Sequence, residues 1–256
     1  MENRKPVGKR VMFMATCLCD AFFAEAARAA VEVLEAAGCE VIFPEDQTCC
    51  GQPAFNGGEF RSSRRVARHA MEVFAGDLPV VVPSGSCAAM NVHGNLLQFE
   101  GEPDLGKAKD LGRRTWELCD YLVNGLGLDR WEGRLRAKVA IHDSCHTRGT
   151  GTGDAMRRLL GGIEDLELCE VGQRDQCCGF GGTFSVAFPH ISAEMGTVKL
   201  DHALEAMPDR VVSSDMSCLM HLSGLAERQG RTIRASSVAE VLRDASAART
   251  STAELG

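Results

Sequence analysis

Short apolar runs alternate with segments of helical periodicity along the whole chain. The runs with the length of buried strands are 10–15, 40–43, 78–82, 138–142, 166–171 and 210–213. The segments with apolar residues at helical spacing are 20–37, 59–74, 154–160 and 191–206. Strands that alternate with helices are typical of an α/β fold with mainly parallel sheets.

The order of predicted elements repeats itself, which favours two half-domains. We place the first at residues 8–133 and the second at residues 134–248. The segment 101–133 separates the repeats and includes a predicted helix at 110–124, whose counterpart in the second half is 236–247. The sequence therefore predicts two similar α/β halves rather than one large sheet.

A cysteine signature also occurs twice, once in each predicted half. The first cysteine set is Cys17, Cys49, Cys50 and Cys87. The second cysteine set is Cys145, Cys177, Cys178 and Cys218. The spacing from the first cysteine to an adjacent pair is the same in both sets, and a glycine follows that pair. Most of these cysteines follow a predicted strand by a few residues, where the loops of parallel sheets form ligand sites.

Adjacent cysteines followed by glycine are typical of a turn in which both sulfurs reach a common centre. Four thiolates from separate loops suit a four-iron iron–sulfur cluster, so we expect one or two clusters of the 4Fe-4S type. Zinc is an alternative, although structural zinc sites usually take closely spaced cysteine pairs. Buried inert thiols are the other alternative, and this is the role expected for the four remaining cysteines, Cys19, Cys39, Cys119 and Cys169.

Composition limits the classes of partner and the compartment. The net charge is −7, and the Lys and Arg residues are scattered rather than clustered, so we expect no binding to nucleic acid. No apolar run approaches the ~20 residues needed to cross a bilayer, so we expect no direct membrane insertion. Twelve cysteines without an export signal predict a cytoplasmic protein with reduced thiols.

The motifs around the cysteines resemble those of the CCG cysteine-rich family, which includes the cysteine-rich chain of heterodisulfide reductase and the iron–sulfur subunit of glycolate oxidase. The matching segments are 47–53 (QTCCGQP), 83–90 (PSGSCAAM), 142–146 (HDSCH) and 177–184 (CCGFGGTF). Their flanking residues are most similar to the lactate-utilisation branch of that family. The resemblance extends from about residue 10 to about residue 245.

This resemblance implies an iron–sulfur redox subunit of a complex that oxidises L-lactate to pyruvate. It also implies two partners, a ferredoxin-type iron–sulfur subunit and a third small subunit, and leaves open whether L-lactate binds at a partner. The sequence departs from heterodisulfide reductase in one respect, because Ser84 and Asp215 stand where that protein has a further cysteine. Each set then offers four thiolates, and either oxygen side chain is a candidate replacement ligand.

Several polar residues close to the second cysteine set are further candidates. His142 and His146 flank Cys145, and we predict catalytic roles for them, as metal ligands, hydrogen-bond donors or proton carriers. His221 is a weaker candidate of the same kind. Of the other charged residues, Arg148 and Arg174 are candidates for holding a substrate carboxylate, and Asp143 for orienting a histidine or capping a loop.

Two other functions are compatible with the same residues. In the first, the adjacent cysteines act as a dithiol that exchanges with a substrate disulfide or an oxidised carrier. In the second, the chain is a non-catalytic assembly subunit that docks a cluster-bearing partner. Iron and sulfide content separates the first alternative from the cluster hypothesis, and the effect of removing one thiol on lactate oxidation tests the second.

Overall fold

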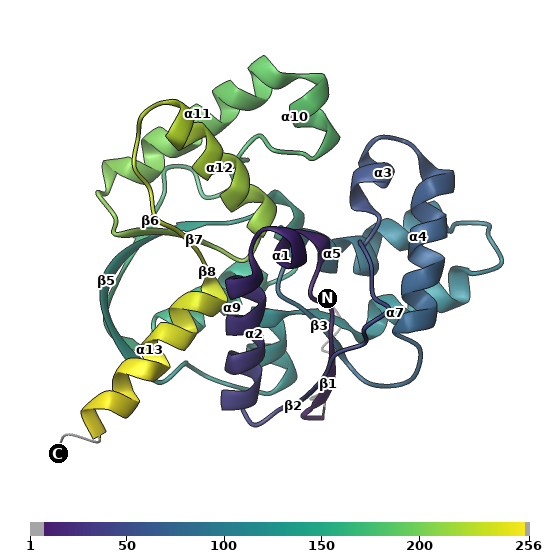
Figure 1. The fold of residues 1–256 in the computed structure, drawn as a ribbon, viewed down its shortest axis with the longest axis horizontal. Helices are drawn as coiled ribbons and strands as arrows, with labels where there is room; N and C mark the ends of the chain where they lie inside the picture. The colour runs from purple at the N-terminus through teal and green to yellow at the C-terminus, as the bar shows by residue number, and fades with distance from the viewer. Residues whose placement is uncertain (1–7, 254–256) are drawn as a thin grey trace.

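Two four-stranded parallel sheets of identical topology form the framework of the computed structural model, which describes residues 8–253 (Figure 1). The first sheet has the order β2 (Glu40–Ile42), β1 (Arg10–Phe13), β3 (Val80–Val82) and β4 (Thr115–Glu117). The second has the order β6 (Ile163–Glu170), β5 (Gly133–His142), β7 (Arg210–Ser213) and β8 (Ala235–Ser237). The predicted α/β class with two similar halves is confirmed.

Helices connect the strands in both halves. Those of the first half are α1 (Cys17–Ala21), α2 (Ala24–Ala36), α3 (Gln52–Asn56), α4 (Phe60–Val73), α5 (Gly85–Ala89), α6 (Asn95–Gln98), α7 (Leu105–Arg114) and α8 (Leu118–Asp120). Those of the second half are α9 (Thr152–Leu160), α10 (Thr183–Ala187), α11 (Pro189–Glu205), α12 (Met216–Arg228) and α13 (Val238–Ala253). Two π-helical turns, η1 (Met90–Gly94) and η2 (Tyr121–Gly125), and a 3-10 turn, η3 (Cys145–Thr147), complete the set.

Two predicted helices are interrupted in the structure. The helix expected at 20–37 is two helices, α1 and α2, which are separated by Phe22 and Phe23. The prediction of one helix at 110–124 is wrong, because the segment Thr115–Glu117 pairs with β3 as an edge strand. Thr115 and Trp116 are buried, and their β-branched and aromatic side chains suit a sheet position. Tertiary pairing therefore overrides the local helical periodicity here.

The two halves share a hydrophobic core. One cluster of buried residues includes Val11 and Phe13 from β1 together with Val139 and Ile141 from β5. The C-terminal helix α13 lies beside α2 of the first half (Figure 1). Trp131 strengthens the packing of α13, since its Nε1 donates a hydrogen bond to the carbonyl oxygen of Leu242 at 3.0 Å. The division at 133/134 stays a prediction, and β5 begins at Gly133.

Within residues 8–253, no helix combines the length and the apolar character that crossing a membrane requires.

A buried carboxylate lies at the end of the edge strand β4. Glu117 is 4% exposed, and its Oε2 accepts hydrogen bonds from the backbone N–H groups of Cys119 at 2.8 Å and Asp120 at 3.1 Å. Its Oε1 is buried and has no hydrogen-bond partner among the described residues. Burial raises the pKa of Glu117 to about 8, so the side chain is protonated at neutral pH.

The raised pKa of Glu117 predicts a protein whose stability falls with rising pH. Between the ordinary pKa of 4.5 and the folded pKa of about 8, the folded state binds one proton more than the unfolded state. The stabilisation is fully present below the lower value and is lost as the pH rises through the upper one, at up to about 1.4 kcal/mol per pH unit.

Glu117→Gln keeps an acceptor for the two backbone groups and removes the titration. Urea unfolding at several pH values should therefore give a flatter stability profile for the variant than for the parent chain. Parallel profiles for the two proteins would show that Glu117 titrates normally.

Candidate metal centre

The carboxyl ends of the strands bring the first cysteine set together. Cys17 begins α1 after strand β1, and the Cys49–Cys50 pair lies in the loop between β2 and α3. Cys87 lies in α5, directly after β3. Two short sulfur–sulfur distances join the set: 3.5 Å from Cys17 to Cys49 and 3.3 Å from Cys50 to Cys87. Thiols from three distant parts of the first half thus form two close pairs that line one cavity.

The second cysteine set has the same arrangement. Cys145 begins the η3 turn after β5, the Cys177–Cys178 pair precedes α10, and Cys218 lies in the first turn of α12. The Sγ atoms of Cys145 and Cys177 are 3.9 Å apart. Cys178 and Cys218 form the buried end of the set, with their Sγ atoms within 4.8 Å of each other. In both sets one pair of thiols is therefore deep and one pair lies nearer the surface.

All eight cysteines of the two sets line a single cavity of about 330 Å³. Its walls come from both halves and include residues of helices α1, α3, α5, α10 and α12. The remaining lining is mostly apolar or neutral, and it includes Pro53, Phe180 and Val186. Sequence reasoning missed the part played by Gln52 and Val186 in this cavity. Their only sequence signal is that they lie shortly after a cysteine pair.

The glycine after each cysteine pair has a backbone conformation that other residues rarely adopt. The φ angles are +86° for Gly51 and +89° for Gly179. A serine of the next long helix anchors each turn: Ser63 Oγ donates to the carbonyl oxygen of Gly51 at 3.1 Å, and Ser192 Oγ to that of Gly179 at 2.8 Å. Each glycine N–H also points at the first sulfur of its pair, at 3.5 Å from Cys49 and 3.4 Å from Cys177.

The close thiols shift one another's pKa values. The hydrogen-bonding contact with Cys17 lowers the pKa of Cys49 to about 2, and the contact with Cys145 does the same for Cys177. The same contacts raise the pKa values of Cys17 and Cys145. Ionisation of one thiol in each set is thus favoured. If all four thiols of a set were ionised, their negative charges would repel one another. A bound cation would offset that repulsion.

The structure places both histidines predicted beside Cys145. His146 is half-buried and lines the cavity, with its Nδ1 at 3.6 Å from the Sγ of Cys145. His142 is 1% exposed and lies at the buried end of the second set, near Cys178 and Cys218. Their catalytic roles stay predictions. His221 does not line the cavity and contacts Ser192 through its Nε2.

Ser84 and Asp215, which stand where heterodisulfide reductase has a further cysteine, contact other polar groups. Ser84 Oγ lies 3.4 Å from Ser86 Oγ. The carboxylate of Asp215 is fully buried and accepts hydrogen bonds from the backbone N–H of Ser86 at 2.7 Å and of Ser217 at 3.0 Å. Ser144 Oγ also lies 3.4 Å from the same carboxylate. Asp215 thus joins loops of both cysteine sets, a role that sequence reasoning missed.

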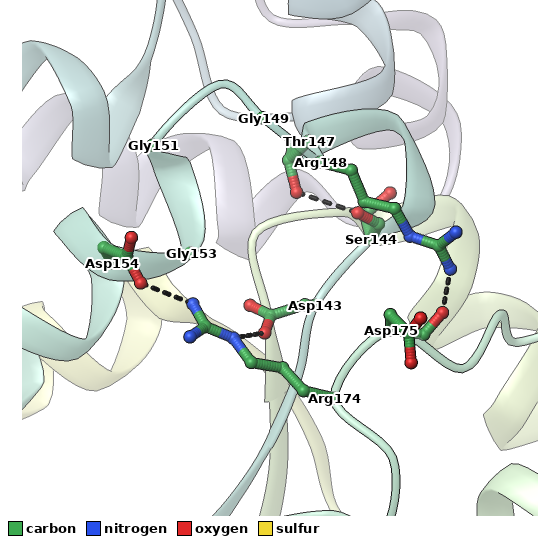
Figure 2. Close-up of a pocket in the computed structure, with 10 residues that line it drawn as sticks. All are labelled: Asp143, Ser144, Thr147, Arg148, Gly149, Gly151, Gly153, Asp154, Arg174 and Asp175. Carbon is green, nitrogen blue, oxygen red and sulfur yellow. Dashed lines mark hydrogen bonds and ion pairs between the residues drawn. The ribbon is translucent and has the colours of Figure 1, made fainter.

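The charged residues near the second set pair with one another, as Figure 2 shows. Arg174 lies between Asp143 and Asp154, with an Nε to Oδ2 distance of 2.7 Å to Asp143. Arg148 contacts the backbone carbonyl oxygen of Asp175. Burial alone would raise the pKa of Asp143, but hydrogen bonds from Arg157 and Arg174 hold it below the usual value. Asp143 therefore anchors arginines and orients neither histidine.

Three of the four remaining cysteines are buried, as predicted. Cys19 and Cys119 are fully buried, and Cys39 is 8% exposed. Cys169 differs, because it lies half-exposed on β6, an edge strand of the second sheet. All twelve cysteines of the chain are free thiols.

The donor sets suit a thiolate-bound metal cluster. Each brings four soft sulfur donors from three separate loops to the wall of one cavity, and thiolates from several loops are how proteins hold iron–sulfur clusters. His142 is buried beside Cys178 and Cys218, and its ring nitrogens have no nitrogen or oxygen partner among the described residues. It is therefore a further candidate ligand. A buried polar side chain of this kind is costly unless it has a partner.

Fold and thiol sets together define a two-part cysteine-rich protein. The family model for the CCG cysteine-rich domain matches this chain twice, at residues 11–90 and 139–223. A crystal structure of a hypothetical protein from Helicobacter pylori shares the fold, with a TM-score of 0.65 at 10% identity. The match covers 94% of this chain and 50% of that one.

Curated relatives match the chain over nearly its whole length. It is 44% identical to lactate utilization protein A of Halalkalibacterium halodurans over 91% of this chain and 96% of the relative. It is 43% identical to the protein of the same name from Geobacillus kaustophilus, over 91% and 98% respectively. It is 40% identical to lactate utilization protein A 1 of Bacillus mycoides, over 92% and 97%. The chain therefore belongs to the lactate utilization protein A family of CCG cysteine-rich proteins.

The hydrogen bonds of Asp215 predict a large effect of its removal on stability. Asp215→Ala leaves the buried N–H of Ser86 and the partly buried N–H of Ser217 without this acceptor, so the free energy of unfolding should fall by about 2–4 kcal/mol. Asp209→Ala is the matched control, because Asp209 accepts one backbone hydrogen bond at an exposed site. Chemical denaturation measures both. Equal losses in the two variants would contradict a bridging role for Asp215.

Proposed function

We propose that this chain is the iron–sulfur redox subunit of a complex that oxidises L-lactate to pyruvate. The observation that carries the proposal is the gathering of both cysteine sets around one cavity. The names of the relatives supply the metabolic context, since they are lactate utilization proteins.

Each set offers four thiolates, the number that holds a four-iron cluster, so the proposed cofactors are one or two 4Fe-4S clusters. When bound, such a cluster accepts and releases single electrons. The cysteines hold it, and the N–H groups of Gly51 and Gly179 donate toward sulfur, which favours the reduced, more negative state. The mostly apolar lining of the cavity limits the access of water.

Oxidation of L-lactate to pyruvate releases two electrons and two protons. Two one-electron centres on one cavity would together hold both electrons. The proposed proton carrier is His146, and the position of its ring at the cavity beside Cys145 supports this role. His142 is the other proposed functional histidine.

The proposed place of L-lactate is on a partner subunit. Among the described residues that line the shared cavity there is no arginine or lysine to bind a carboxylate. Arg148 and Arg174, the candidates for that role, are engaged with neighbouring residues instead. The proposed partners are a ferredoxin-type iron–sulfur subunit and a third small subunit. The proposed compartment is the cytoplasm, a reducing environment that suits a chain in which none of the twelve cysteines forms a disulfide.

Metal analysis tests the cluster proposal directly. Protein purified without oxygen should contain about four irons and four sulfides per occupied set, with visible thiolate-to-iron absorption. Cys50→Ser and Cys178→Ser should each abolish the centre of their own set and leave the other. Cys169→Ser is the control, because Cys169 lies outside both sets, and its iron content should equal that of the parent chain.

Colourless, iron-free protein would refute the cluster proposal and favour the dithiol alternative. The lowered pKa values of Cys49 and Cys177 suit thiol exchange, so thiol titration of that protein would then show a reactive pair. The assembly alternative has a separate readout. Full lactate oxidation by a complex that carries Cys177→Ser would show that this chain only docks its partners.

A further inference from the structure

The two halves carry different residues at an equivalent position close to the first cysteine of each set. One constant offset along the chain relates Cys17 to Cys145 and the first cysteine pair to the second. The same offset relates Met14 to His142. Met14 directly follows β1 and His142 is the last residue of β5, an inner strand of each sheet, and each lies three residues before the first cysteine of its set. Equivalent positions beside the two sets thus carry side chains of different chemistry.

His142 is buried without a conventional hydrogen-bond partner. It is 1% exposed, and neither ring nitrogen has a nitrogen or oxygen partner within residues 8–253, although the Cys218 thiol is close enough to interact with the ring. Leaving a buried polar group unsatisfied costs about 1–3 kcal/mol. The ring is directed at sulfur, since one of its nitrogens lies within 4.8 Å of both Cys178 Sγ and Cys218 Sγ. An imidazole nitrogen is a common metal ligand, and the three groups together could hold a metal ion.

Met14 at the first set has a different environment. It is fully buried in an apolar cluster that includes Phe74 and the deep thiols Cys50 and Cys87. Its Sδ accepts a hydrogen bond from Asn91 Nδ2 at 3.5 Å. A thioether is a weak acceptor and packs well among apolar groups, so Met14 needs no further partner. Of these two equivalent side chains, only His142 of the second half is left unsatisfied.

We propose that a ring nitrogen of His142 is a direct donor to the metal centre of the second cysteine set. This inference rests on the proposed metal binding and deepens it. The first centre then has sulfur donors only, whereas in the second the imidazole takes the place of one thiolate, because a four-iron cluster takes four such donors. Imidazole is uncharged and a thiolate carries a full negative charge, so the two centres differ in reduction potential. A chain of two nearly identical halves thereby holds two unequal electron sites.

The test isolates the second set in a chain that carries Cys49→Ser and Cys50→Ser. Metal-free protein is titrated with Co²⁺ under reducing conditions, with absorption as the readout. His142→Met, which copies the residue of the first half, should weaken Co²⁺ binding at least about tenfold and change the ligand-field spectrum. Unchanged affinity and an unchanged spectrum would overturn the proposal.

The iron-loaded protein gives a second, independent readout. With ¹⁵N-labelled histidine, the paramagnetic second centre should show the strong hyperfine coupling of a bound nitrogen, and His142→Met should abolish it. The difference in midpoint potential between the two centres should narrow in the same variant. Absence of coupling in the parent chain would refute direct ligation.

Thermal unfolding of the metal-free proteins separates ligation from a structural role. A residue that only packs would destabilise the chain when replaced, whereas loss of an unsatisfied imidazole should leave the melting temperature unchanged or raised. A lowered melting temperature in metal-free His142→Met would count against the proposal. If the parent chain binds no iron but its Co²⁺ affinity depends on His142, the proposed function fails and this inference stands.

Discussion

Hydrogen bonds across the boundary between the halves hold the two cysteine sets beside one shared cavity. The backbone N–H of Gly85 donates to the carbonyl oxygen of Ser214 at 2.9 Å, and that of Ser86 donates to the Asp215 carboxylate at 2.7 Å. These donors lie just before Cys87, and the acceptors just before Cys218. The position of one set is therefore tied to that of the other, and the shared cavity depends on this junction.

Close packing at the junction leaves little room for change. A Cβ on Gly85 would lie 2.2 Å from Cγ2 of Thr147, in the turn that begins with Cys145. Thr147 is itself fixed, because its Oγ1 donates to the carbonyl oxygen of Ser144 at 2.9 Å. The loops that carry thiols are therefore braced by one another as well as by their own sheets. Such bracing favours donors that are positioned before a ligand arrives, which reduces the entropy lost on binding.

Much of the fold could be predicted from the sequence, because strand runs such as Val80–Val82 are short, apolar and bounded by turn residues. The edge strand at Thr115–Glu117 could not, since three residues that continue a helical pattern become a strand only through pairing with β3. The cysteine sets were visible as a repeat, and the parallel-sheet topology explains why their members meet.

The union of the two sets around one cavity was not visible in the sequence. It depends on contacts between the halves, such as that of Asp215 with Ser86, which lie 129 residues apart. The bridging role of Asp215 has the same origin, because a local pattern shows only a turn residue before a helix. The lack of a nitrogen or oxygen partner for the His142 ring also depends on packing in the core. That His142 stands where the first half has Met14 can be read from the repeat.

The unequal depth of the thiols within each set has a consequence for handling in air. Cys50 and Cys87 are nearly buried, whereas Cys17 is exposed and Cys49 partly so. A thiol that is accessible and readily ionised reacts first with peroxide, and its sulfenic acid condenses with a neighbouring thiol. Because the Sγ atoms of Cys17 and Cys49 are only 3.5 Å apart, oxidation of the first set should begin at these two thiols. The buried thiols of Cys50 and Cys87 would be oxidised only after those of Cys17 and Cys49.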